Sequence, residues 1–440
     1  MWSATPAARS RLGFAGLLVA SLALAGCGGS SSGEGGEVTL EFLVDNGPTS
    51  VRTAEGLAAD YHRQHPNVTI EVETRPEGGD GDNVVKTRLA TGEMADIFLY
   101  NTGSLFQALN PQETLLPVTD KAVLDRLQES FTPSVTAGDE VYGVPMGVAL
   151  GGGVLYNKAV YDELGLDIPK TWDEFMANNA KIKAAGTAAP VAQTYQTTWT
   201  AQLFLLGDYH NVQQAEPGFA EDYTAGDTGF SRSEEADDGF EHLQQVHDAG
   251  YLNKDFASSD FDDGVRMIAT GEAAHYPMLT DAISEIAAKY PQHMKDVGFF
   301  ALPGENAESA GLTAWTSGGL YIPTTTEDEE LEAAEDFRAF VASEAGCRSQ
   351  TKAQTPGGPY MVDGCELPDA VPGAVKDLES YFEQEGATTP ALEFLSPIKG
   401  PALEHICVEI GSGIRSAEDG AALYDEDVEK QAQQLGLEGW

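Results

Sequence analysis

The chain has 440 residues, enough for two domains that each bury a core. Its 25 Lys and Arg residues face 70 Asp and Glu residues, and the resulting net charge of −45 argues against nucleic acid or an anionic membrane surface as a partner. A hydrophobic content of 42% with 9% aromatic residues is typical of a folded protein and excludes a disordered acidic chain. A well-solvated surface and a saline habitat both explain such acidity, and composition leaves both open.

The N-terminus predicts export and a lipid anchor. Arg9 and Arg11 precede an apolar run over residues 12–25 that is too short to span a bilayer. The run ends in Leu-Ala-Gly-Cys, which matches the bacterial lipobox, whose cysteine (Cys27) is lipidated after cleavage. We therefore expect a signal peptide over residues 1–26, a lipidated Cys27 with a Gly/Ser tether over residues 27–37, and a protein held at the outer face of the cytoplasmic membrane. An ordinary secretory signal with a chance cysteine is the alternative.

Loss of the signal peptide leaves 23 basic against 70 acidic residues, a net charge of −47. An exported protein can form disulfides, and Cys347 and Cys365 are the expected pair because they flank a Gly/Pro-rich loop. Cys407 lies among apolar residues and is expected to be a buried thiol. No later apolar run is long enough for a transmembrane helix, and the cysteine spacing does not indicate zinc.

The first hundred residues of the exported part alternate between strand and helix patterns. Strands are expected over residues 38–44, 68–72 and 96–100, with helices over residues 51–61 and, after a loop at 76–82, around residues 85–89. Such alternation predicts an α/β fold with a mostly parallel sheet covered on both faces. Ligands of such sheets bind at the carboxyl ends of the strands, which makes Asp45, Asn46, Tyr100, Asn101 and Ser104 candidates for a ligand site. The alternative is that these residues form polar turns.

Residues 142–186 carry the clearest local signals. Residues 143–156 are apolar, glycine-rich and uncharged, as in a buried strand or a pair of short strands. Asn157 is expected to cap a short helix that Gly165 ends, and Thr171 and Glu174 to form a capping box on a helix closed by Gly186.

Three motifs of this segment, YGVP, LYNK and PKTWDEF, resemble in sequence and order the family 1 extracellular solute-binding proteins. These are the sugar-capturing proteins of ABC importers, similar in plan to maltose-binding protein. The resemblance implies a two-lobed periplasmic-binding-protein fold of type II with hinge crossings between the lobes. It assigns residues 38–147 and 310–354 to an N-terminal lobe and residues 148–309 and 355–440 to a C-terminal lobe.

The middle of the chain departs from the family pattern. Helices are expected over residues 240–252 and 261–274, the second running into a region where the family has G-x-x-A-M-x-x-x-G-x-W with a sugar-stacking tryptophan. Here His275 stands for the methionine, Leu279 for the glycine and Asp281 for the tryptophan. Asp281 could still accept hydrogen bonds from hydroxyl groups, while Tyr276 or Trp199 would supply the aromatic face.

The last third is expected to contain two further crossings. Residues 297–304 resemble the strand that leads to the second crossing, and residues 312–323 its return strand. A helix is expected over residues 327–342, a cleft loop over residues 354–360, and a closing helix over residues 424–440.

No catalytic motif is present: the sequence has no GxSxG, Walker A, HExxH or CxxC. His62 and His65 have helical spacing but lack an acidic partner, and residues 78–83 resemble only the start of a calcium loop. We therefore expect no enzyme activity, no metal and no cofactor.

Sugars present apolar faces and rings of hydroxyl groups, so their sites combine aromatic platforms with Asp, Asn and Gln. The candidate ligand-binding residues are Asp45, Asn46, Tyr100, Asn101, Ser104, Gln196, Trp199, Tyr276, Asp281, Trp315 and Tyr360. The resulting hypothesis is a monomeric lipoprotein that closes over a neutral sugar and delivers it to the permease and ATPase of an ABC importer. The alternatives are an exported carbohydrate-active enzyme and a binding protein for a non-sugar solute such as a polyamine.

Overall fold

The computed structural model describes residues 36–440. The predicted signal peptide, Cys27 and nearly all of the tether lie outside these residues. Within the described part, no helix has both the length and the apolar character that crossing a membrane requires.

The first lobe is built on a five-stranded sheet with the order β2-β1-β3-β12-β6. Its strands are β1 (Val38–Asp45), β2 (Val68–Arg75), β3 (Ile97–Tyr100), β12 (Gly318–Tyr321) and β6 (Val144–Met146). The first three are parallel, as predicted, whereas β12 runs antiparallel to both of its neighbours. Phe42, Leu43 and Val44 are buried in succession, because both faces of the sheet are covered.

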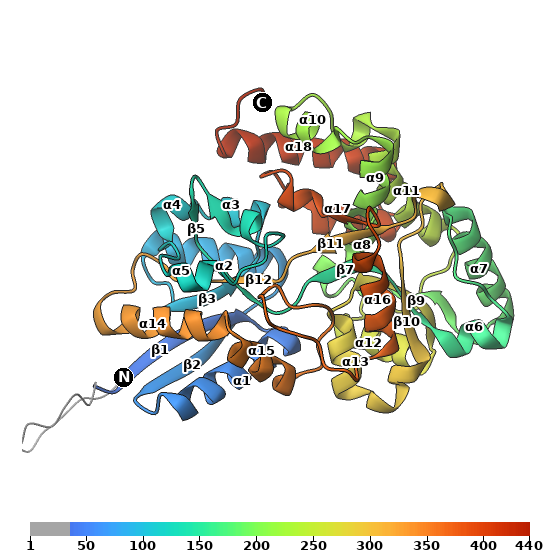
Figure 1. The fold of residues 1–440 in the computed structure, drawn as a ribbon. Helices are drawn as coiled ribbons and strands as arrows, with labels where there is room; N and C mark the ends of the chain where they lie inside the picture. The colour runs from blue at the N-terminus through green and yellow to red at the C-terminus, as the bar shows by residue number, and fades with distance from the viewer. Residues whose placement is uncertain (1–35) are drawn as a thin grey trace, which may run out of the picture. The chain divides into compact units, whose positions relative to one another are not determined.

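Helices and a small hairpin surround this sheet. They are α1 (Pro48–Gln64), α2 (Gly78–Thr91), α3 (Ser104–Gln107), α4 (Pro111–Thr114), α5 (Lys121–Leu124), η1 (Thr132–Val135), β4 (Thr136–Ala137), β5 (Glu140–Val141), α14 (Asp328–Val341) and α15 (Glu344–Ala353). Figure 1 shows α1, α14 and α15 beside β1 and β2, and α1 contacts both β2 and α15. Phe337 of α14 packs edge-on against Phe42 and Tyr61 and joins the helices to the sheet.

Helix α2 begins earlier than predicted. Residues 78–82 form its first turn and are not a loop. Gly81 explains the difference, because a Cβ there would lie 1.9 Å from the carbonyl oxygen of Pro76, so only glycine allows the chain to turn this tightly into the helix.

The second lobe is built on a six-stranded sheet around β7 (Leu150–Asn157). The other strands are β8 (Ala189–Val191), β9 (Ala273–Leu279), β10 (Val297–Ala301), β11 (Leu312–Trp315) and β13 (Thr388–Pro390). Strand β7 runs antiparallel to β9 on one side and to β10 and β11 on the other. A Cβ on Gly152 would lie 2.3 Å from the Trp315 ring, so the glycine run of β7 lets a large ring pack on the strand.

The helices of the second lobe cover this sheet. They are α6 (Lys158–Leu164), α7 (Trp172–Ala185), η2 (Thr198–Gln202), α8 (Leu203–Leu206), α9 (Tyr209–Ala215), α10 (Phe219–Ala225), η3 (Phe230–Arg232), α11 (Glu234–Asp248), α12 (Phe261–Thr270), α13 (Ala282–Lys289), η4 (Pro291–Asp296), η5 (Ala307–Ser309), α16 (Gly373–Glu383), η6 (Leu392–Phe394), α17 (Leu403–Gly411) and α18 (Ala417–Gln434). Asn157 caps α6 by accepting a hydrogen bond from the Val160 amide at 3.1 Å, and Gly165 ends it at φ 61°.

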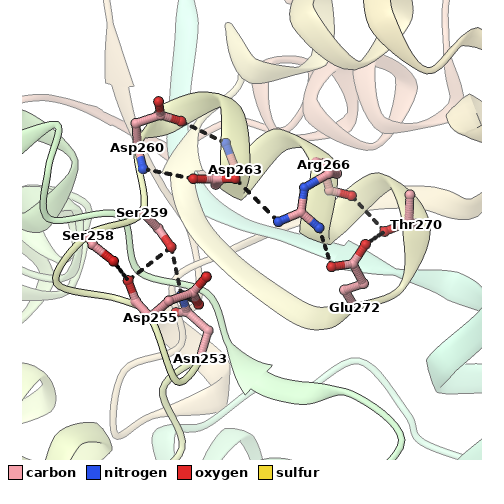
Figure 2. Close-up of polar contacts among 9 residues, drawn as sticks. All are labelled: Asn253, Asp255, Ser258, Ser259, Asp260, Asp263, Arg266, Thr270 and Glu272. Carbon is pink, nitrogen blue, oxygen red and sulfur yellow. Dashed lines mark hydrogen bonds and ion pairs between the residues drawn. The ribbon is translucent and has the colours of Figure 1, made fainter.

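The predicted capping box of α7 is only half formed. Thr171 Oγ1 accepts from the Glu174 amide at 3.3 Å, but the Glu174 carboxylate accepts from the amide of Lys170 and not from that of Thr171. A complete box is found on α12, where Asp260 and Asp263 each accept from the other's amide (Figure 2).

Several predicted boundaries need correction. The helix expected over residues 261–274 ends at Thr270, where Gly271 has φ 77°, and residues 273–279 form strand β9. The helix expected from residue 240 starts at Glu234, and the closing helix spans Ala417–Gln434. Residues 312–323 are two strands in different sheets, so the chain changes lobe between Trp315 and Gly318, inside the segment 310–354 that we had expected to lie in the first lobe.

Candidate functional site

The two lobes meet at the carboxyl ends of the first three strands. Helices α1, α2 and α3 follow β1, β2 and β3, and they contact α13, η2 and η6 of the second lobe, respectively. At the third contact Gly103 has φ 67°, and a Cβ there would lie 2.3 Å from the Glu393 carbonyl oxygen. We call the residues at these three contacts the inter-lobe interface, which is where ligands of parallel sheets bind.

The α1–α13 contact is an ion pair between the lobes. Glu285 of α13 is fully buried and accepts from Thr49 Oγ1 at 2.8 Å and from the guanidinium of Arg52, both on α1. Lys289 lies 3.5 Å from the same carboxylate. The sequence analysis missed Arg52 and Glu285, because residues 233 positions apart carry no local sign of their pairing.

Asp45 and Glu77 are neighbouring carboxylates at the ends of β1 and β2. Asp45 accepts from the Gly47 amide at 3.0 Å and from Ser50 Oγ at 2.9 Å, so it orders the first turn of α1. A Cβ placed on Gly47 would lie 2.7 Å from both Asp45 Oδ1 and Glu77 Oε1. Burial, with a contribution from Asp45, raises the pKa of Glu77 to about 7. Glu77 could have been found, since it follows a strand end just as Asp45 does.

Asp281 lies at the start of α13, on the second-lobe side of the same interface. Burial raises its pKa to about 7, and the carboxylates of Glu77, Glu285 and Asp45 add to the effect. One of its oxygens is shielded from solvent and has no hydrogen-bond partner among the described residues. The position predicted to accept hydroxyl groups therefore lies where carboxylates from both lobes converge.

Tyr100 is buried in the core of the first lobe and is not at the surface of the interface. Its side chain is 1% exposed, and the guanidinium carbon of Arg75 lies 5.4 Å from the centre of its ring. Burial, then the charge of Asp82, raises the pKa of its hydroxyl. The ring therefore packs in the core beneath the strand ends. Asn46 and Asn101, next to these strand ends, are exposed.

The α3–η6 contact contains a second charged group. Trp315 Nε1 donates to the Glu393 carboxylate, whose other oxygen lies 3.3 Å from Lys399 Nζ. Burial lowers the pKa of Lys399, but the carboxylates of Glu393, Glu404 and Asp82 outweigh it and leave this pKa raised. Trp315 itself packs on Gly152 and is 8% exposed, so it offers only an edge to a ligand.

The segment that carries Gln196 and Trp199 is held by the loop before α12. The Gln193 amide donates to Asn253 Oδ1 at 2.8 Å, and the Gln196 amide donates to the Ser259 carbonyl at 3.0 Å. Asn253 in turn donates to Asp255 and Ser259, which closes the loop on itself. On α12, Arg266 joins Asp263 to Glu272 and holds the helix that follows the loop.

Trp199 is the one predicted aromatic residue with a partly exposed side chain, and Gln196 beside it is exposed. Its ring centre lies 5.7 Å from that of Phe261, and its Nε1 has no hydrogen-bond partner among the described residues. Helix α2, which Glu77 precedes, contacts η2, which contains Trp199, so the two residues belong to the same part of the interface. Trp199 can therefore present an aromatic face next to hydrogen-bonding groups.

Tyr276 does not take the predicted position. It is fully buried on β9, its hydroxyl is 2.8 Å from Thr194 Oγ1, and its ring packs on Gly264. The face that would stack on a ligand contacts protein, because the strand turns it away from the interface. Tyr360 is likewise 4% exposed and hydrogen-bonded to Thr351, in a cluster with Cys347.

Cys347 and Cys365 form a disulfide, and Cys407 is a buried free thiol. The disulfide ties α15 to the loop beyond residues 354–360. Within residues 354–360, the Thr355 carbonyl accepts from Ser284 Oγ at 2.8 Å, which links this loop to α13.

Several polar atoms at or near the interface are shielded from solvent and lack a partner among the described residues. They are Tyr100 Oη, Ser104 Oγ, Trp199 Nε1, Asp281 Oδ1, Ser317 Oγ and Gln354 Oε1. Buried polar groups are normally hydrogen-bonded, so such a collection belongs where a polar ligand or water completes the bonding.

A protein-family model covers most of this chain. The model of the bacterial extracellular solute-binding proteins matches residues 47–346. The chain belongs to this family. The resemblance of the YGVP, LYNK and PKTWDEF motifs is thereby confirmed.

Individual members of the family show the same relationship over most of their length. The multiple sugar-binding protein of Streptococcus mutans serotype c is 26% identical over 382 residues, which are 84% of each chain. The melibiose/raffinose/stachyose-binding protein MelE of Bacillus subtilis (strain 168) is 22% identical over 347 residues, 76% of this chain and 77% of MelE.

Solved structures confirm the two-lobed α/β fold. A chitin oligosaccharide binding protein superposes with a TM-score of 0.79 at 21% identity, covering 91% of this chain and all of that one. The binding protein RafE in complex with raffinose gives 0.72 at 18% identity, covering 90% of this chain and 99% of RafE.

Proposed function

We propose that this solute-binding protein captures a neutral sugar or oligosaccharide between its lobes and delivers it to the permease of an ABC importer. The observation that carries the proposal is the inter-lobe interface, where strand ends of the first lobe meet the second lobe around unpartnered polar atoms. The names of the related sugar-binding proteins support the ligand class.

The proposed mechanism is hinge closure, in which the ligand contacts both lobes only in the closed form and shifts the population toward it. Trp199 stacks on a sugar ring, and Gln196 and Asp281 hydrogen-bond to hydroxyl groups from the second lobe. Asp45, Asn46 and Asn101 do so from the first lobe. Each of these side chains is exposed or partly exposed, as a ligand contact requires.

The remaining parts of the proposal concern the cellular location and the partner proteins. A lipid on Cys27 anchors the protein as a monomer to the outer face of the cytoplasmic membrane. Its two lobes, bounded as in the family except that residues 310–315 belong with the second one, meet membrane-embedded permease subunits driven by a cytoplasmic ATPase. Membrane fractionation tests the anchor: Cys27→Ala is expected to release the protein from the membrane. An unchanged membrane fraction would contradict lipidation.

A second candidate ligand is a cationic solute such as a polyamine. The carboxylates of Asp45, Glu77, Asp281 and Glu285 converge at the interface, and the Tyr276 ring is buried elsewhere. An ammonium group among these carboxylates would compensate their negative charge, which a neutral sugar cannot do.

A thermal-shift screen of residues 38–440 against raffinose, stachyose, chitin oligosaccharides and spermidine separates the candidates. A ligand at 100 times its Kd adds about 2.7 kcal/mol to the folded state, a shift of a few degrees in Tm. Trp199→Ala is expected to raise the Kd of a sugar about tenfold, the loss of about 1.4 kcal/mol of stacking and contact.

Trp440→Ala is the matched control, because this tryptophan is also partly exposed but lies on the C-terminal tail, bonded to the Thr224 carbonyl. A shift with spermidine alone would remove the sugar from the proposal. Recovery of the sugar unchanged after incubation is expected of a binding protein, and its turnover would indicate an enzyme.

A further inference from the structure

The inter-lobe interface brings together ionisable groups that would separate if the lobes opened. We propose that closure of the two lobes takes up protons, through the carboxylates of Glu77 and Asp281 that lie on opposite sides of this interface. The inference rests on the hinge closure of the proposed function and adds to it a dependence on pH.

Both carboxylates are attached to rigid parts of different lobes. Glu77 lies between β2 and α2, and Asp281 lies between β9 and α13. Gly357 packs closely on the backbone at Asp281: a Cβ on Gly357 would lie 2.6 Å from the Thr280 carbonyl oxygen and 3.4 Å from Asp281 Cα. Opening of the lobes would therefore move the two carboxylates apart.

Charged groups face the pair from every neighbouring element. The acidic ones are Asp45 after β1, Asp262 on α12, Glu285 on α13 and Glu404 on α17, whose carboxylate lies beside Gly78; the basic ones are Arg52 on α1, Arg75 on β2 and Lys289 on α13. Trp199 of η2, the element that contacts α2 after Glu77, is uncharged.

The three basic groups have partners other than Glu77 and Asp281. Arg52 pairs with Glu285, and Lys289 pairs with Asp262 and Glu285. Arg75 lies over the Tyr100 ring and donates to the Pro76 carbonyl. In the described part of the chain, neither Glu77 nor Asp281 has a cation within ion-pair distance.

The direction of the effect follows from this environment. Burial first, and then the neighbouring acids, raises the pKa of both Glu77 and Asp281 to about 7 in the closed arrangement. Separated and hydrated, the two carboxylates would titrate near the ordinary value of about 4. The closed form therefore binds protons more tightly, so it is favoured at acidic pH and loses this advantage as the pH rises through about 7.

The ligand-free protein provides the direct test, by small-angle X-ray scattering of residues 38–440 between pH 6.0 and 8.5. The ratio of closed to open molecules is expected to fall by up to about tenfold per pH unit for each proton taken up, seen as a rising radius of gyration. The double variant Glu77→Gln/Asp281→Asn is expected to remain compact throughout. The control Glu71→Gln/Asp173→Asn makes the same charge change at exposed positions and is expected to behave as the wild type.

Two results would overturn the proposal: a radius of gyration that does not change with pH in the wild type, or one that changes equally in all three proteins. The second result would assign the effect to general charge repulsion. Raffinose binding at pH 7.0, measured separately by Tm, reports on the proposed function alone. If the wild type expands as the pH rises but binds no raffinose, the result would support proton uptake on closure and contradict the proposed sugar ligand.

Discussion

His275 stands where the family motif has methionine, and the structure explains how the chain accommodates it. The side chain is fully buried on β9, and its Nδ1 faces two acceptors, Asn179 Oδ1 at 2.9 Å and the Pro190 carbonyl at 3.0 Å. Nδ1 therefore carries the proton, and Nε2 accepts from the Tyr161 hydroxyl at 2.7 Å. Burial lowers the pKa of His275 to about 3, so the ring is held in its neutral form.

A buried neutral histidine makes stability depend on pH. Below pH 6.5, about the ordinary pKa of histidine, His275 binds a proton in the unfolded chain but not in the native site. The stability that neutral His275 contributes is therefore full above this pH and is lost as the pH falls toward 3. His275→Met is expected to reduce the slope of unfolding free energy against pH by about 1.4 kcal/mol per unit, measured by urea unfolding at pH 7, 6 and 5. His405→Met, at an exposed position, should leave the slope unchanged; equal slopes in all three proteins would contradict the assignment.

At the scale of elements, single polar side chains join strands and helices that the sequence pattern treats separately. Asn157 ends β7, and its Oδ1 caps α6 while its Nδ2 donates to the Ile268 carbonyl of α12 at 2.9 Å. The side chain is 2% exposed, so neither bond can be replaced by water. The cap was predicted from the sequence; the bond to α12 was not.

Asn157→Ala is expected to destabilise the protein by about 2 to 4 kcal/mol, the sum of a lost cap and a buried carbonyl left unpaired. Ser416→Ala removes an exposed cap of α18 and should cost only about 1 kcal/mol. Urea unfolding of both variants measures the difference. Equal losses would mean that the α12 bond contributes nothing.

At the scale of the whole molecule, the pair between Arg52 and Glu285 fastens one lobe to the other. Glu285 is fully buried while the Arg52 side chain is 30% exposed, so the pair is partly screened and contributes less than a fully buried one. Because both groups are satisfied only when α1 lies against α13, the pair stabilises the closed form specifically.

Arg52→Ala is therefore expected to raise the Kd of a bound sugar about tenfold and to increase the radius of gyration of the ligand-free protein at pH 6.0. The tenfold change corresponds to about 1.4 kcal/mol of closed-form stabilisation. Arg63→Ala is the matched control, since this arginine of the same helix pairs with Asp60 inside the first lobe. A Kd shifted equally by both variants would argue against a role in closure.

The α/β class and most strands follow from sequence patterns within about ten residues. The family and its two lobes follow from the resemblance of motifs spread over residues 142–175. The alternation around residues 38–44, the cap at Asn157 and the glycine after α6 are fixed by local backbone preferences. The rule that ligands bind at strand ends also selected Asp45, and it applies equally to Glu77, which lies in the loop expected over residues 76–82 but was not chosen as a candidate.

The tertiary structure alone decided which candidates face the other lobe. Trp199 and Tyr276 look alike as aromatic residues near a predicted crossing, yet one is partly exposed and the other lies in the core. The bond from Thr49 to Glu285 joins residues 236 positions apart. Such pairings depend on how two sheets and their helices pack together, and burial and charge at the interface arise only from that packing.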